Sequence, residues 1–167
     1  MKAIVALDLN NGLALNGRMP WRLPSDLAFF YHQTKHSPVI MGRKTYTSVG
    51  GGLKQRHNLV LTRGKWVSVD KSKDIQFFSN VEDLKTEAVR LQTFSSGEKT
   101  IWVIGGAEIY SLFLPSIDEI VISRVQKDYS CDKFFPDMSD FTLLNEVDVV
   151  CQKGDSDYVR REWWIRR

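Results

Sequence analysis

The 167-residue sequence has few of the features that mark secreted, membrane or metal-binding proteins. Its two cysteines, Cys131 and Cys151, are too few for a disulfide framework and form no metal-binding pattern. No apolar run approaches the roughly 18–20 residues that span a bilayer, and Asp8 interrupts the first apolar stretch too early for a secretory signal. A composition of 43% hydrophobic and 26% charged residues excludes disordered and collagen-like chains. We therefore expect one cytoplasmic, monomeric domain over residues 1–167, without metal or membrane partner.

Acidic residues are scarce in the first part of the chain. Residues 1–66 contain ten Lys or Arg but only Asp8 and Asp26, a net charge of +8, whereas residues 67–167 carry −5. An excess of positive charge favours an anionic ligand. The basic residues stand singly between apolar segments, and no nucleic-acid-binding motif is present. This pattern favours a small polyanion over nucleic acid.

The apolar segments and their glycine or proline breaks predict alternating strands and helices. Strands are expected at residues 2–9, 38–42, 57–62, 100–104 and 117–124, and helices at 25–36, 43–49, 80–94 and 107–114. Residues 10–19 should form a turn-rich loop, 66–79 a short strand with loops, and 141–151 with 157–166 a hairpin. The order predicts a single-domain α/β fold, with a mostly parallel central β-sheet flanked by helices and a C-terminal antiparallel hairpin.

Asp26 is the only acidic residue between Leu9 and Val69, in the aromatic-rich segment WRLPSDLAFFYH. Because Pro24 and Ser25 precede it, Asp26 could be a first-turn carboxylate that interacts with the helix dipole. Alternatively, it is a carboxylate in an apolar cleft, where it pairs with a cationic or amidine-like group of a ligand. The spacing alone leaves both interpretations open.

Two strand-to-helix turns are candidates for phosphate binding. In VIGGAEIY, residues 103–110, a buried strand passes through two glycines into a helix, which exposes backbone amides to an anion. In VIMGRKTY, residues 39–46, Arg43 and Lys44 open a helix whose dipole they oppose. Such a local conflict is typical of a functional site. Thr62 and Arg63 follow the next strand, and ligands of open α/β sheets bind at this edge.

Five segments together resemble the dihydrofolate reductase family in order, spacing and total length. They are MPWRLPSDLAFF (19–30), PVIMGRKTY (38–46), LKQRHNLVLTR (53–63), WVIGGAEIYSLFLP (102–115) and DKFFP (132–136). The resemblance implies an oxidoreductase that reduces 7,8-dihydrofolate to 5,6,7,8-tetrahydrofolate, with hydride transfer from NADPH to pterin C6 and protonation at N5. It also implies that antifolate inhibitors bind.

The resemblance further implies a role for each matching residue. Asp26 would pair with the pterin amidine edge and Trp21 would hold a water beside it, which makes these two the implied catalytic residues. The implied substrate-binding residues are Ile4, Ala6, Leu27, Phe30, Val49, Leu53, Arg56, Ile104, Tyr110 and Ser123. Among these, Arg56 would clamp the glutamate carboxylate of the substrate.

Most of the implied NADPH-binding residues lie in the two turns described above. The full set is Ala6, Leu13, Gly42, Arg43, Lys44, Thr45, Leu61, Thr62, Arg63, Ser79, Gly105, Gly106, Ala107, Glu108 and Ile109. Arg43, Lys44, Thr62 and Arg63 match a pocket for the 2′-phosphate, and the two glycines match a pyrophosphate-binding turn with a cis peptide. Residues 10–19 match a loop that closes over nicotinamide.

Two other functions stay open at this point. One is a pyrimidine reductase of riboflavin synthesis, which shares the fold, and the other is a folate- or NADPH-binding protein without turnover.

Overall fold

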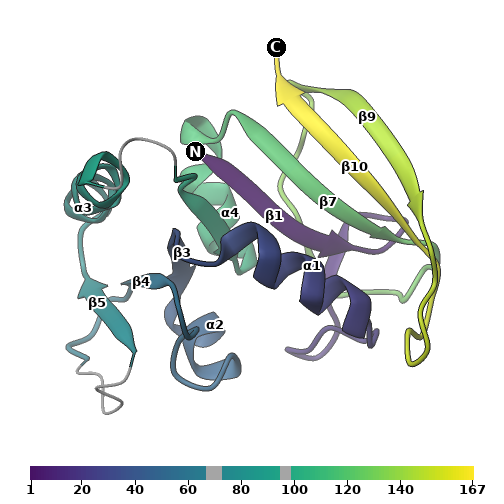
Figure 1. Ribbon diagram of the computed structural model, residues 1–167, viewed down its shortest axis with the longest axis horizontal. Coiled ribbons are helices and arrows are strands. Elements are labelled where there is room, and N and C mark those ends of the chain that lie inside the picture. The colour runs from purple at the N-terminus through teal and green to yellow at the C-terminus, as the bar shows by residue number, and fades with distance from the viewer. Residues whose placement is uncertain (67–72, 95–98) are drawn as a thin grey trace.

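The computed structural model describes residues 1–66, 73–94 and 99–167. Its centre is an eight-stranded sheet with the order β5-β4-β3-β6-β1-β7-β10-β9 (Figure 1). These strands are β1 (Lys2–Leu7), β3 (Pro38–Gly42), β4 (His57–Leu61), β5 (Asp74–Phe78), β6 (Trp102–Gly105), β7 (Glu119–Val125), β9 (Phe141–Val149) and β10 (Val159–Arg166). From β5 to β7 all neighbours are parallel, and β10 is antiparallel to both β7 and β9. The predicted α/β fold with its terminal hairpin is confirmed.

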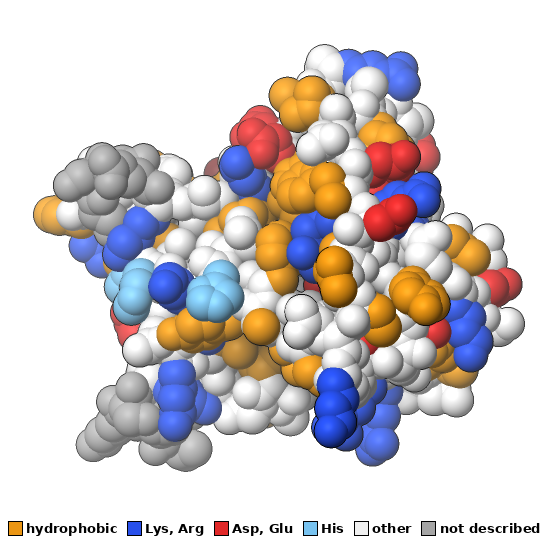
Figure 2. Space-filling view, turned by 45° about the vertical axis from the view of Figure 1, so that its right-hand side comes forward, with side chains coloured by type: hydrophobic (Ala, Val, Ile, Leu, Met, Phe, Trp, Pro, Cys, Tyr) orange, Lys and Arg blue, Asp and Glu red, His pale blue; other side chains and the backbone are white. Residues whose placement is uncertain are grey.

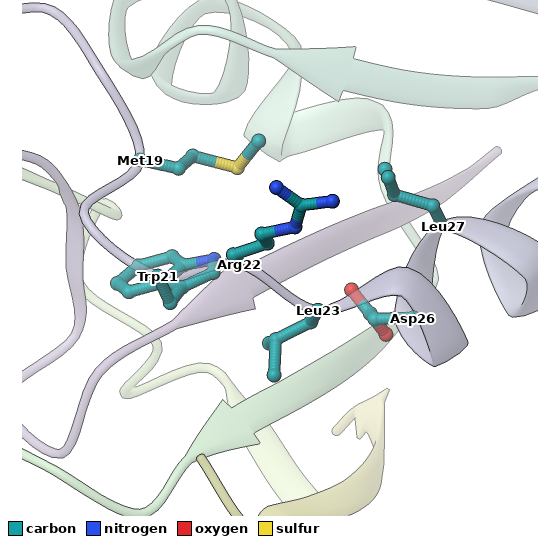
Figure 3. A pocket seen from close by; sticks show the side chains of 6 residues that line it. All are labelled: Met19, Trp21, Arg22, Leu23, Asp26 and Leu27. Carbon is teal, nitrogen blue, oxygen red and sulfur yellow. The ribbon is translucent and has the colours of Figure 1, made fainter. Parts of the chain in front are cut away.

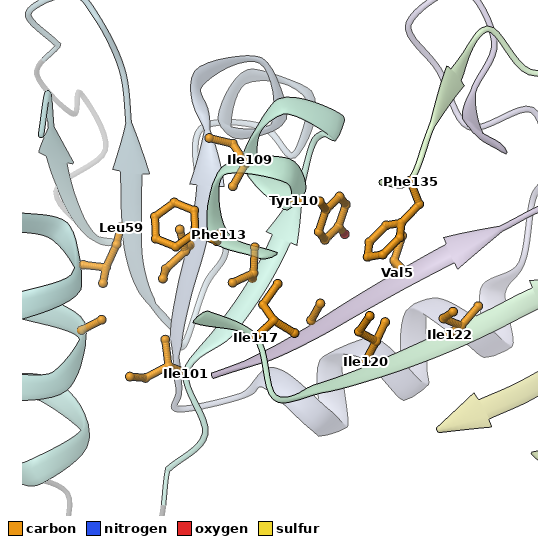
Figure 4. Close-up of a cluster of buried hydrophobic side chains, with 14 of the residues drawn as sticks. Val5, Leu59, Ile101, Ile109, Tyr110, Phe113, Ile117, Ile120, Ile122 and Phe135 are labelled. Atoms are coloured by element: carbon orange, nitrogen blue, oxygen red, sulfur yellow. The ribbon is translucent and has the colours of Figure 1, made fainter. Parts of the chain in front are cut away.

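Helices cover both faces of the sheet. α1 (Pro24–Thr34) and α2 (Arg43–Ser48) lie on one face, and α3 (Val81–Phe94), α4 (Ala107–Phe113) and the 3-10 helix η1 (Leu114–Ser116) on the other. On β1, Val5 packs in the cluster beneath α3 and α4 (Figure 4), whereas Ile4 packs with Phe29 and Phe30 of α1. Because both faces are buried, β1 is a nearly continuous apolar run.

β1 ends at Leu7, earlier than predicted, because the buried carboxylate of Asp8 turns the chain. Its Oδ1 accepts hydrogen bonds from the amides of Asn10 and Gly12 at 2.8 and 2.7 Å, and its Oδ2 accepts one from the amide of Tyr129 at 3.1 Å. Burial acts to raise the pKa of Asp8, but these backbone donors outweigh it, so the pKa lies below its usual value.

The predicted loop at residues 10–19 contains a short strand. This strand, β2 (Gly12–Ala14), pairs with β8 (Lys133–Phe134) as a separate two-stranded sheet. Sequence periodicity could not reveal it, because two or three residues are too few to show alternation.

Other element boundaries differ slightly from the prediction. α1 ends at Thr34 because His36 adopts a left-handed φ of 61°, and β7 begins at Glu119 rather than at 117. α3 begins at Val81 rather than at residue 80, because the Asn80 side chain caps it by accepting hydrogen bonds from the amides of Glu82 and Asp83. β5 lies within the predicted 66–79 region, of which residues 67–72 are outside the described residues. None of the described helices combines the length and apolar character that a bilayer crossing requires.

Candidate active site

The ends of four parallel strands bring the predicted phosphate-binding residues to one edge of the sheet. Gly42 at the end of β3 is in register with Leu61 of β4, which is in register with Phe78 of β5. β6 ends beside β3 at Gly105. The residues that follow these ends are Arg43, Lys44, Thr45, Thr62, Arg63, Ser79, Gly106, Ala107 and Glu108. The fold thus gathers side chains from four separate segments.

The Gly105–Gly106 turn fits closely between α4 and α2. The peptide bond between the two glycines is cis, and Gly105 has a φ of 113°. A Cβ at Gly105 would lie 3.0 Å from the Tyr110 ring, so only glycine fits there. A Cβ at Gly106 would lie 3.8 Å from Thr45 Oγ1, which places the beginnings of α2 and α4 next to each other. Backbone amides of both helices therefore face one region.

Three cations at this edge have the chemistry that a phosphate dianion requires. The side chains of Arg43, Lys44 and Arg63 are exposed, and the Arg43 guanidinium lies 5.5 Å from the centroid of the Trp66 ring. Within the described part of the chain none of the three pairs with a carboxylate. The residues present thus fit the phosphates of a dinucleotide.

Asp26 lies in the first turn of α1 and points toward the sheet. Ser123 Oγ of β7 donates a hydrogen bond to Asp26 Oδ1, and Arg161 Nη2 of β10 donates to the same oxygen at 3.0 Å. The Asp26 side chain is 17% exposed and that of Arg161 is 11% exposed. The N-cap residue Leu23 makes no side-chain cap, and the described partners of the Asp26 carboxylate are groups of the sheet. Ser123, which the resemblance implies is a substrate-binding residue, thus contacts Asp26 directly.

Arg161 is a site residue that sequence reasoning missed. Strand register places Ser123 between Ala6 and Arg161, so the three residues form a row across β1, β7 and β10. Burial lowers the pKa of Arg161, and pairing with Asp26 opposes that effect. A sequence signal for Arg161 exists: it stands two positions before Trp163, and residues two apart on a strand point to the same face. Trp163 packs on the face that α1 covers. Only the register across three strands shows that this residue reaches Asp26.

The Asp26 carboxylate lies at a cavity of about 150 Å³ (Figure 3). The cavity is lined by Met19, Trp21, Arg22, Leu23, Asp26 and Leu27. Figure 3 shows the guanidinium of Arg22 directed into the same space as the carboxylate. Two predicted residues beside Asp26, Trp21 and Leu27, are therefore brought to one cavity.

Five of the predicted substrate-binding residues belong to one apolar cluster. Ile4 is buried in it, and Phe30, Val49, Leu53 and Ile104 are among the partly buried side chains that pack against it. Ala6 packs instead with Trp21 and Leu23.

Arg56 lies at the other end of α1. Its guanidinium carbon is 5.7 Å from the centroid of the Phe30 ring, and its Nη1 donates to the Lys54 carbonyl at 2.7 Å. Burial lowers the pKa of Arg56. It lines a second hollow with His36, Gln55, His57, Asp74 and Lys99. Figure 2 shows Lys, Arg and His side chains gathered side by side on the left of the molecule.

Three predicted ligand-binding residues lie in or beside the core beneath α4. Tyr110 is 2% exposed, and its hydroxyl donates to the Ile4 carbonyl at 2.8 Å. Ile109 is buried, with Cγ1 3.0 Å from where a Cβ of Gly42 would be, and Leu13 of β2 packs against the same core. In this structure Tyr110 therefore supports the turn at Gly105 and does not line the Asp26 cavity.

Comparisons with known proteins agree with one another. The family model described as "Dihydrofolate reductase" matches residues 1–161. The chain is 36% identical to the dihydrofolate reductase of Haemophilus influenzae over 137 residues, which cover 81% of this chain and 78% of that protein. It is 32% identical to that of Bacillus subtilis over 158 residues, covering 93% and 88%. The chain belongs to the dihydrofolate reductase family.

A solved dihydrofolate reductase has the same fold. The enzyme of Enterococcus faecalis, in complex with NADP(H) and RAB-propyl, superposes with a TM-score of 0.79 at 24% identity, covering 99% of this chain and 95% of that one. Family membership confirms the predicted oxidoreductase class, the reduction of dihydrofolate, and NADPH as the cofactor of the family. The individual binding roles of the residues above remain predictions.

Proposed function

We propose that this chain reduces 7,8-dihydrofolate through a pterin site built on Asp26. The supporting observation is the state of its carboxylate: Oδ1 is held by Ser123 and Arg161, while Oδ2 accepts no hydrogen bond from any described residue and lies at the cavity with Trp21. An open carboxylate oxygen in an apolar cleft accepts a hydrogen bond from the amidine edge of a pterin.

Each residue of this site has a physical role. Asp26 orients the ring through its 2-amino and N3 groups, and its negative charge favours a proton at N5. Leu27, Phe30 and Ile104 supply apolar walls that exclude water and hold the ring in place. Arg56, whose planar guanidinium suits a carboxylate, would bind the glutamate end of the substrate.

NADPH, when bound, supplies the hydride for pterin C6. The residues that would hold it are those at the strand ends: Arg43, Lys44, Thr62 and Arg63 for the 2′-phosphate, and the turn at Gly105 and Gly106 for the pyrophosphate. Residues 10–19, which include β2, would cover the nicotinamide. Antifolates would compete with dihydrofolate at Asp26.

We further propose that the chain acts as a single domain over residues 1–167 and as a monomer in the cytoplasm. Its partners would be small molecules, the substrate and NADPH, as the scattered positive charge of residues 1–66 indicates.

A spectrophotometric assay of NADPH oxidation tests the proposed reaction. The purified chain is supplied with dihydrofolate, with the pyrimidine substrate of riboflavin synthesis, or with neither. We expect oxidation with dihydrofolate only. Oxidation with the pyrimidine alone, or binding of NADPH and dihydrofolate without turnover, would overturn the proposal.

A further inference from the structure

The Asp26 carboxylate is already partly occupied by the protein itself. Ser123 Oγ and Arg161 Nη2 both donate to Oδ1, and Oδ2 has no hydrogen-bond donor among residues 1–66, 73–94 and 99–167. A carboxylate oxygen has two lone pairs in its plane, so both acceptor positions of Oδ1 are filled. A ligand with two parallel N–H groups therefore meets one open oxygen and one occupied oxygen.

Arg161 is held rigidly in this position. The residue is 9% exposed, and its guanidinium carbon lies 3.4 Å from the centroid of the Phe29 ring, so the group is packed against α1. Its Nε is buried and has no hydrogen-bond partner among the residues that the structure describes. Because burying an arginine without full pairing costs stability, a role beyond packing would explain its presence.

Positive charge dominates the surroundings of Asp26. Arg161 approaches from β10, and Arg22 lines the same cavity. The carboxylate of Asp155 accepts hydrogen bonds from the backbone amide and the hydroxyl of Ser25, the residue before Asp26, at 3.1 and 2.7 Å. The Asp26 carboxylate therefore already has a cationic partner before any ligand enters.

We propose that Arg161 is a positioning residue that makes this site favour a neutral pterin over a cationic diaminopyrimidine. The proposal rests on the pterin-binding role of Asp26 proposed above. A neutral dihydropterin donates to Oδ2 and adds no charge to the Asp26–Arg161 pair. A diaminopyrimidine that binds as its protonated ring places a second cation beside the same carboxylate. At such low exposure, solvent screens this repulsion only weakly.

Arg161→Met tests the proposal, because it keeps an unbranched apolar chain against Phe29 and removes the charge. We expect the dissociation constant of trimethoprim, a diaminopyrimidine, to fall at least tenfold, while the KM for dihydrofolate changes by less than threefold. Arg161→Lys keeps the charge and should preserve the wild-type ratio of the two constants. If Arg161→Met does not fold, Arg161→Gln, which keeps a donor for Oδ1, is tested in its place.

Arg160→Met is the matched control. Arg160 is the neighbouring arginine on β10, but it pairs with Asp148 at 2.9 Å and Glu146 at 3.8 Å and is 41% exposed. Its loss should leave both constants unchanged. Equal changes in the two constants for Arg161→Met, or the same altered ratio in Arg161→Lys, would overturn the proposal. Normal turnover in Asp26→Asn would instead refute the proposed site, whatever the Arg161 variants do.

Discussion

At the scale of single residues, Asp26 shows how a charge can be recognised in sequence while its environment is not. The isolation of Asp26 among basic and aromatic residues makes it a candidate ligand-binding residue, and the family resemblance implies that Ser123 is a substrate-binding residue. Arg161, the nearest charge to Asp26, lies 135 positions away in the chain. Sequence patterns report the neighbours of a residue along a strand or helix, whereas this pair depends on register across three strands.

Replacing Asp26 with Asn should separate its chemical role from its structural one. The amide keeps the shape of the side chain but cannot favour a proton at N5, so kcat with dihydrofolate should fall by roughly 10²–10⁴. The defect should shrink as pH falls, because more substrate then arrives already protonated. Arg161 loses its counter-ion, so the melting temperature should fall as well. Steady-state kinetics across pH, combined with a thermal melt, measure both effects.

The control for this variant is Asp155→Asn. Asp155 binds Ser25, the residue before Asp26, but does not contact Asp26 itself. We expect its kcat to match the wild type. A folded Asp26→Asn protein with unchanged kcat at neutral pH would remove Asp26 from the mechanism and favour the helix-dipole interpretation.

The two thiols should differ sharply in reactivity. Cys151 is exposed, whereas Cys131 is buried, and burial together with the negative charge of Asp8 raises the pKa of Cys131 to about 11. At pH 8 only about one Cys131 side chain in a thousand is then a thiolate, the form that reacts. A disulfide reagent should therefore label one equivalent quickly and the second only after unfolding. Cys151→Ser should abolish the fast phase, and rapid labelling of that variant would contradict the assignment.

At the scale of elements, the strands and helices with a clear apolar or helical pattern could be predicted, and the two shortest strands, β2 and β8, could not. An apolar run or helical spacing, with a glycine, a proline or a cap at the boundary, predicts each of β1, β3, β4, α3 and α4. β2 and β8 pair beside Asp8, whose carboxylate accepts hydrogen bonds from the amides of both Gly12 and Tyr129. Because their pairing depends on tertiary contacts between distant segments, the local sequence pattern does not predict it.

The strand ends that carry Arg43 and Arg63 should determine cofactor choice. A charge-assisted hydrogen bond to a phosphate contributes roughly 1.5–3 kcal/mol, so Arg43→Ala or Arg63→Ala should raise the KM for NADPH about tenfold or more. NADH lacks the 2′-phosphate, so its kinetics should hardly change. Arg90→Ala, which removes an exposed cation paired with Glu87 on α3, is the control. Equal losses with NADPH and NADH would show that these arginines do not bind the extra phosphate.

At the scale of the whole molecule, Asp8 links stability to pH. Its pKa is lowered in the folded state, so the ionised carboxylate stabilises the fold at pH values above its unfolded pKa of roughly 3.9. This contribution is lost as pH falls through the lower, folded value. Asp8→Asn should therefore reduce the free energy of unfolding by about 1–3 kcal/mol at pH 7, and the difference from the wild type should disappear in acid.

Denaturant titrations from pH 7 down to pH 2 would measure that difference. Asp148→Asn provides the control, because Asp148 is 78% exposed and its pair with Arg160 lies on the surface, where such pairs contribute little. A gap between wild type and Asp8→Asn that stays constant across this range would show that the Asp8 charge is not what stabilises the fold.

The strand order β7-β10-β9 has a consequence for how the protein is made. β9 leaves the ribosome before β10, yet it reaches the sheet only through β10, which lies between it and β7. Newly made β9 therefore has no strand to pair with until β10 has been translated. The two strands must join the rest of the molecule together, after nearly all of the chain described here has been synthesised. Asp26, which is synthesised 135 positions before Arg161, therefore lacks this partner until β10 has emerged.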